Sequence, residues 1–195
     1  MTSVYMKDYS PDYPRKWERL WYDESDEVLD IRRRNLLDVN AVLKNYSVTM
    51  IPFYGTLLGM IRENDLIRGD RDDDCIIMHT DMEKFSEEVL AQLQLRGFEL
   101  CRIYGEGEGH KHCITLGRHD RTVDLTLYTP HGGEHYKYHN STHVIHRSYL
   151  DNLQEIQMWS DTFKIPSKNE KVLSAIYGQD WRTPKSRKWS EGYCC

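Results

Sequence analysis

The sequence predicts a single α+β domain, on the basis of its length and of two repeating patterns along the chain. Its 195 residues fit one domain that can bury a substantial core. Some segments carry apolar residues near every 3.6 positions, as amphipathic helices do, whereas others are short apolar runs typical of strands. We therefore expect helices that flank a β-sheet.

Composition and charge exclude several classes of protein. The net charge is −5, so no overall basic surface is available for generic nucleic-acid binding. No apolar run approaches the roughly 20 residues that cross a bilayer, and the first residues lack the apolar core of a signal peptide. We expect a cytoplasmic protein without a transmembrane segment. The five cysteines are odd in number and match no zinc-binding spacing, so we interpret them as reduced thiols.

The N-terminal part divides into an arm and a long helix. Residues 1–22 are rich in Tyr, Pro, Asp and Trp, and the prolines disfavour a long helix there. Residues 24–46 show a helical apolar stripe with acidic residues in the first turn. Arg32, Arg33 and Arg34 within this helix are interpreted as a solvated face, with the alternative that they hold an anionic substrate.

A strand, a glycine and a helix then follow one another directly. Residues 48–53 are predicted to be a strand, and residues 55–63 a helix that begins at Gly55. The free N–H groups and the dipole of such a helix start attract anions. Gly55 allows the backbone to approach a phosphate closely, and the Thr56 hydroxyl can donate a hydrogen bond. Arg62, one or two turns further on, could neutralise charge on a leaving group.

The most informative segment places four carboxylates within five positions, at Asp70, Asp72, Asp73 and Asp74. Residues 72–78 are predicted to be a strand, and alternate side chains of a strand share one face. Asp70, Asp72 and Asp74 therefore lie on the same side, where they repel one another unless a cation separates them. Mg²⁺ (or Mn²⁺) suits such carboxylates together with substrate phosphate oxygens.

The rest of the domain alternates helices and strands up to a polar tail at residues 185–195. We expect helices at 81–96, 149–156 and 169–177, and strands at 98–104, 111–116, 122–128 and within 158–166. Asp124 lies in the apolar strand 122–128, where its charge must be compensated. It is either an ion-paired structural residue or a third ligand or base beside Asp72 and Asp74.

Five histidines between residues 131 and 146 raise the question of a second metal site. The first four recur every four residues, which on a helix would form a ligand face. The glycines and the Asn-Ser pair in this stretch instead favour a loop and hairpin, so the metal hypothesis is left open. The alternative is that the stretch covers an acceptor site.

The segment GTLLGMIR at residues 55–62, followed by Asp70-x-Asp72-x-Asp74, closely resembles the signature of the LicD/fukutin family. Val123-Asp124-Leu125 and a segment at 165–184 are similar to further family motifs. The resemblance implies a nucleotidyltransferase-like mixed β-sheet flanked by helices, over residues 23–184. It implies Asp72, Asp74 and Asp124 as catalytic residues and metal ligands, with Asp70 as an additional candidate ligand.

The resemblance also implies a substrate class. Family members move a phospho-alcohol, such as phosphocholine or ribitol phosphate, from a CDP-linked donor to a sugar hydroxyl. Two alternatives remain open: transfer of a nucleoside monophosphate, and an inactive module that binds glycans or partners. Asp73 replaces the apolar residue that the family carries between its last two aspartates. Strand alternation places Asp73 beside Arg71 on the opposite face, where the two could pair.

Overall fold

The computed structural model describes residues 23–104, 113–137 and 144–185. The predicted N-terminal arm, the glycine-rich residues 105–109 and residues 186–195 of the predicted polar tail lie outside these ranges. The helices of the described chain are α1 (Asp26–Asn45), α2 (Tyr54–Arg62), α3 (Glu87–Leu95), α4 (Arg147–Leu150) and α5 (Asn169–Tyr177), with a 3₁₀ helix η1 at His79–Lys84.

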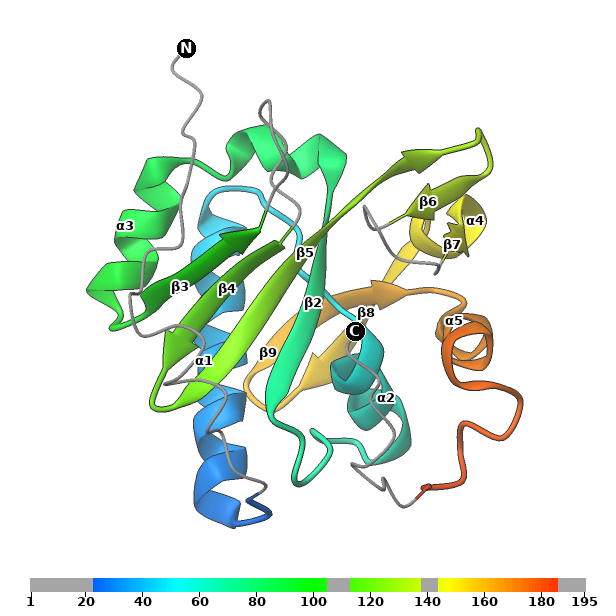
Figure 1. Ribbon diagram of the computed structural model, residues 1–195, viewed down its shortest axis with the longest axis horizontal. Coiled ribbons are helices and arrows are strands. Elements are labelled where there is room, and N and C mark those ends of the chain that lie inside the picture. Colours follow the sequence, from blue (N-terminus) through cyan, green and yellow to red (C-terminus); the bar gives the residue numbers. More distant parts are fainter. Residues whose placement is uncertain (1–22, 105–112, 138–143, 186–195) are drawn as a thin grey trace.

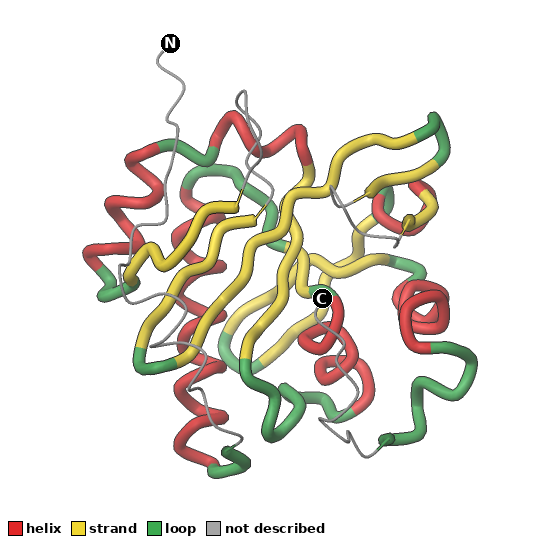
Figure 2. The backbone as a smooth tube through the Cα atoms, in the orientation of Figure 1, coloured by secondary structure: helices red, strands yellow, loops and turns green. Residues whose placement is uncertain are grey.

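A mixed β-sheet forms the centre of the fold (Figures 1 and 2). Its strands are β1 (Ile51–Pro52), β2 (Asp72–Met78), β3 (Glu99–Tyr104), β4 (Cys113–Arg118), β5 (Arg121–His131), β6 (His135–Lys137) and β7 (Val144–His146). The order is β1-β2-β5-β4-β3, and β6 and β7 continue from the long strand β5. Only β2 and β5 are parallel among the described pairs, which confirms the α+β class with a mixed sheet.

One face of the sheet is covered by α1 and α3. Figure 1 shows α1 behind the strands, and Leu36, Val39 and Leu43 of this helix are fully buried. They pack against inward residues of β2, β4 and β5 in one continuous apolar cluster. The helix begins where Ser25 Oγ accepts a hydrogen bond from the Val28 amide, which supplies one of the caps that a helix start needs.

On the other face, the apolar cluster of the described residues lies near β1 and the C-terminal part of β5. A second cluster joins Phe53 and Leu57 at α2 to Tyr128 of β5 and to α5. The separate hairpin of β8 (Leu153–Met158) and β9 (Asp161–Pro166) contacts both apolar clusters. Phe163 lies in the first cluster and Ile165 in the second.

Two predicted elements and the predicted exposure of one residue differ from the structure. The helix expected at 149–156 is wrong: the helix is the single turn α4, and residues 153–158 form strand β8. The helix expected at 81–96 is divided into η1 and α3. The interpretation of Arg32 as part of a solvated face is also wrong, because its side chain is almost fully buried. Strand β2 and helix α5 have the predicted bounds.

Candidate active site

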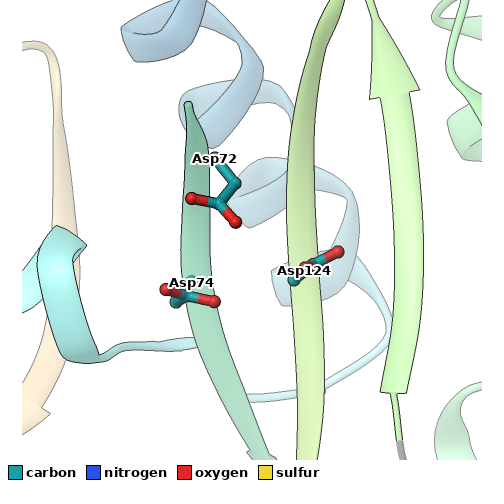
Figure 3. Close-up of side chains that lie close together, drawn as sticks. All are labelled: Asp72, Asp74 and Asp124. Atoms are coloured by element: carbon teal, nitrogen blue, oxygen red, sulfur yellow. The ribbon is translucent and has the colours of Figure 1, made fainter. Parts of the chain in front are cut away.

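The parallel pairing of β2 with β5 brings three carboxylates together. Asp74 lies opposite Asp124 in the register, and Asp72 lies opposite Thr122, one strand repeat earlier. Register partners and residues two apart on a strand point to the same face, so all three carboxylates share it. One oxygen from each side chain lies within 4.8 Å of the others. Figure 3 shows Asp72 and Asp74 along one strand and Asp124 on the neighbouring strand.

The electrostatics of this cluster oppose full ionisation. Burial, and then the negative charges of Asp124, Asp70 and Asp73, raise the pKa of Asp72 to about 7, although Arg32 acts against the rise. Burial and the neighbouring carboxylates also raise the pKa of Asp74 well above its ordinary value. Carboxylates this close cannot all be charged unless a cation neutralises them.

The surroundings of Asp124 indicate whether the three carboxylates could bind a cation. Burial raises its pKa, while the Thr115 hydroxyl and the positive charge of Arg102 favour its charged form. Its Oδ1 atom is buried and accepts no hydrogen bond within the described chain. A buried carboxylate oxygen without a donor is costly, and a hard divalent ion bound by oxygen ligands would satisfy it. The residues present therefore fit Mg²⁺ or Mn²⁺.

Asp73 points away from this cluster, as the strand alternation predicts, but its partner is not Arg71. Arg32 of α1 binds it in a bidentate ion pair, with Nε–Oδ2 3.1 Å and Nη2–Oδ1 2.7 Å. Arg32 also donates to the carbonyl oxygens of Ile67 and Asp72. The extra aspartate is therefore neutralised behind the sheet, and α1 is fastened to the strand that carries Asp72 and Asp74.

The start of α2 lies close to Asp70, which precedes Asp72 by two residues. A Cβ atom on Gly55 would lie 2.5 Å from Asp70 Oδ2, so any other residue here would push the Asp70 carboxylate away from the start of the helix. Tyr54 begins the helix with φ of 44°, a conformation that is strained for a bulky residue. Thr56 is buried, and its hydroxyl has no hydrogen-bond partner among the described residues. Asp70 is not one of the three grouped carboxylates.

The structure does not bring Arg62 to this site. Arg62 is the last residue of α2, eight positions after Tyr54 and thus about 12 Å along the helix axis. Its Nε donates to Glu63, and its Nη1 donates to the carbonyl oxygen of Trp181. These contacts attach the C-terminal segment to α2.

The histidine-rich stretch forms a hairpin, not a helix, where the structure describes it. His135 and His146 face each other across β6 and β7, with ring centroids 5.3 Å apart. The Tyr136 hydroxyl donates to Asp151 and fastens the hairpin to the turn after α4. His139 and His143 lie outside the described ranges, so the question of metal binding here remains a hypothesis.

Sequence reasoning missed two polar residues on the same face as the carboxylates. Arg102 of β3 lies opposite Thr115 of β4, which in turn lies opposite Asp124. A register irregularity between Leu100 and Arg102 sets this alignment. The position of this irregularity could not be predicted from the residue pattern. A polar threonine in the apolar strand β4 was the one available signal.

The geometry and the comparisons with known proteins together define the class. An antibiotic-resistance factor, ANT(2'')-Ia, aligns in its solution structure with a TM-score of 0.50 and 11% identity, over 74% of this chain and 69% of that one. The lincosamide antibiotic adenylyltransferase LnuA, in its lincomycin-bound structure, aligns with a TM-score of 0.48 and 12% identity, over 72% of this chain and 83% of that one. The first likeness shows a nucleotidyltransferase fold.

The particular family follows from the sequence. Residues 47–168 match the family described as LicD/FKTN/FKRP, nucleotidyltransferase domain, and the chain belongs to that family. A search of the curated proteins finds no match. Membership and fold support a transferase of the phosphotransferase or nucleotidyltransferase type. Across the described ranges, every helix is too short or too polar to serve as a membrane-spanning segment.

Proposed function

We propose that the protein transfers a phospho-alcohol, such as phosphocholine or ribitol phosphate, from a CDP-linked donor to a hydroxyl of a sugar or glycan. The convergence of Asp72, Asp74 and Asp124 on one face of the sheet carries the proposal. Family membership supports the type of transfer. A divalent cation bound by these carboxylates would neutralise the donor's phosphates and the charge that develops during transfer.

The protein residues have distinct roles in this proposal. Asp72 and Asp74 hold the cation, and the first amides of α2 at Gly55 and Thr56 bind a donor phosphate. The unpartnered Thr56 hydroxyl is available as a further donor. Burial raises the pKa of Asp124, which makes it a stronger base for the proton of the attacking hydroxyl. We leave Arg62 out of the phosphate site because Glu63 and Trp181 hold it at the far end of α2.

The test is product analysis with the purified protein. CDP-choline, CDP-ribitol and CDP-glycerol are each supplied with Mg²⁺ and a mixture of sugar acceptors, and products are identified by mass. We expect release of CMP and an acceptor that gains the phospho-alcohol. Release of pyrophosphate from a nucleoside triphosphate, with a nucleotide on the acceptor, would instead establish nucleotidyl transfer.

Variants assign the reaction to the site. Asp72→Asn, Asp74→Asn and Asp124→Asn should each lower turnover by about 10²–10⁴-fold, because each removes a ligand or the base. Asp180→Asn is the matched control, since this aspartate makes a surface ion pair with Lys185. Unchanged Mg²⁺-dependent turnover in Asp72→Asn or Asp74→Asn would defeat the assignment.

A further inference from the structure

A row of three side chains runs across the sheet on the face that carries the candidate active site. Arg102, Thr115 and Asp124 occupy matching positions on β3, β4 and β5. Because register partners point to the same face, all three side chains lie on it. Arg102 is two strand spacings from Asp124, which is about 10 Å between their backbones.

Arg102 and Thr115, the two members of the row beyond Asp124, carry hydrogen-bond donors. Thr115 is 2% exposed, and its Oγ1 makes no hydrogen bond of normal geometry within the described chain. It lies close enough to Asp124 to stabilise the charged carboxylate. The positive charge of Arg102 also acts on Asp124 and on Cys113 of β4, and the register places the Arg102 side chain on the face that these residues share. A cation and a hydroxyl side by side suit an oxyanion.

The position of this row relative to α2 decides which substrate it could contact, and this step rests on the proposed function. Gly55 is in α2, which directly follows the edge strand β1, and it lies close to Asp70; donor phosphates are proposed to bind there. Attacking and leaving oxygens are roughly in line in phosphoryl transfer. The acceptor therefore approaches from the opposite side, over β5, β4 and β3.

We propose that Arg102 and Thr115 form a subsite for an oxyanion group, such as a phosphate, carried by the acceptor. The acceptor would then be a negatively charged sugar or glycan rather than a neutral one. Arg102 would bind the anionic group, and the Thr115 hydroxyl, which lies between Arg102 and Asp124 in the row, would donate its one hydrogen bond to that group.

Inorganic phosphate is the probe for this subsite. Phosphate is titrated by calorimetry into the protein saturated with CDP and Mg²⁺, so that the donor side is filled. We expect phosphate to bind, and Arg102→Gln to weaken it at least about tenfold while CDP affinity stays within about twofold. Arg102→Lys should retain part of the phosphate affinity, and Thr115→Val should lose about three- to tenfold.

The control and the contrary outcomes separate this subsite from the donor site. Arg34→Gln changes an exposed arginine of α1, behind the sheet, and should leave both affinities unchanged. Phosphate that fails to bind beside CDP would overturn the subsite, as would equal loss of CDP and phosphate affinity in Arg102→Gln. If CDP and Mg²⁺ do not bind the unaltered protein, the proposed function fails. A loss of phosphate affinity in Arg102→Gln without CDP would then still support the subsite.

Discussion

The buried pair of Arg32 and Asp73 is the residue-scale feature that holds the candidate site in place. Both side chains are almost fully shielded from solvent, and the guanidinium binds both carboxylate oxygens. Asp73 lies between Asp72 and Asp74 on β2 with its side chain on the opposite face, where Arg32 of α1 meets it. An aspartate that departs from the family pattern thus has its carboxylate on the opposite face, ion-paired with Arg32, although its charge still contributes to the raised pKa of Asp72.

Removing one partner of this pair should be strongly destabilising. Arg32→Met leaves the Asp73 carboxylate buried without its cation, and we expect a loss of about 3–5 kcal/mol in the free energy of unfolding, measured by urea denaturation. Arg34→Met in the same helix should change it by less than about 0.5 kcal/mol, because Arg34 is exposed. The double variant Arg32→Met/Asp73→Leu should recover much of the loss. A loss below about 1 kcal/mol in Arg32→Met would contradict this account.

Individual residues were predictable where local periodicity decides their direction. Strand alternation placed Asp72 and Asp74 on one face and Asp73 on the other, and the register confirms both placements. The partner of Asp73 was not predictable, because Arg32 is 41 residues away and no local pattern links the two. The same limit applies to Arg102, whose approach to Asp124 depends on the register of three strands.

At the scale of elements, α2 and the loop that follows it form one packed unit. Gly59 lies in the interior of the helix, where glycine normally costs stability relative to alanine. Here a Cβ atom would lie 2.6 Å from the Asp65 carbonyl oxygen and 2.8 Å from the Ile67 amide nitrogen. The returning backbone occupies that space, and it leads directly into Asp70 and Asp72.

The usual effect of a glycine-to-alanine change in a helix should therefore be reversed at Gly59. We expect Gly59→Ala to lower the free energy of unfolding by about 1–3 kcal/mol, because the backbone contacts cannot move aside as a flexible side chain could. Gln94→Ala, at an exposed position of α3, should have an effect below about 0.5 kcal/mol. Thermal and urea unfolding measure both. A stabilised Gly59→Ala variant would show that the loop does not pack as described.

Helices and strands were predictable where their apolar residues follow one repeat clearly, either the 3.6-residue repeat of a helix or the two-residue repeat of a strand. The acidic strand β2 and the helix α5 have clear patterns and clear ends, and their bounds agree with the prediction. Strand β8 was mistaken for part of a helix because Leu153, Ile156 and Met158 fit neither period well. Its hairpin turn contains Trp159 at φ of 53° rather than a glycine, so the usual turn signal was absent.

At the scale of the whole molecule, the sheet separates an apolar face from a face that carries charge. Residues of β5 contribute to both, because Val123 and Leu125 pack under α1 while Asp124 faces the site. The sequence placed Asp124 in a strand, but periodicity alone left its role open. Its place beside Asp74 depends on a parallel pairing between segments 50 residues apart, which the register shows. The family resemblance implied only that Asp124 acts together with Asp72 and Asp74.

The crowded carboxylates should make the stability of the whole protein depend on pH and on divalent cations. The pKa of Asp72 is raised from 3.8 to about 7 in the folded state, and that of Asp74 is raised as well. At pH values between the unfolded-state and folded-state pKa values, the folded state holds protons that the unfolded state has released. Without metal, the free energy of unfolding should therefore fall as pH rises from about 4 to about 7, by about 1.4 kcal/mol per pH unit for each such proton.

A divalent cation should reverse this loss, because it binds the deprotonated carboxylates of the folded state only. The rise in melting temperature on adding Mg²⁺ or Mn²⁺, relative to a chelator, should be larger at about pH 8 than at about pH 5. Asp74→Asn removes one repelling charge and one ligand, so it should melt higher than the unaltered protein in chelator at about pH 8 and respond little to either cation. Equal cation effects at both pH values, or a cation response that survives in Asp74→Asn, would mean that the three carboxylates do not form the metal site.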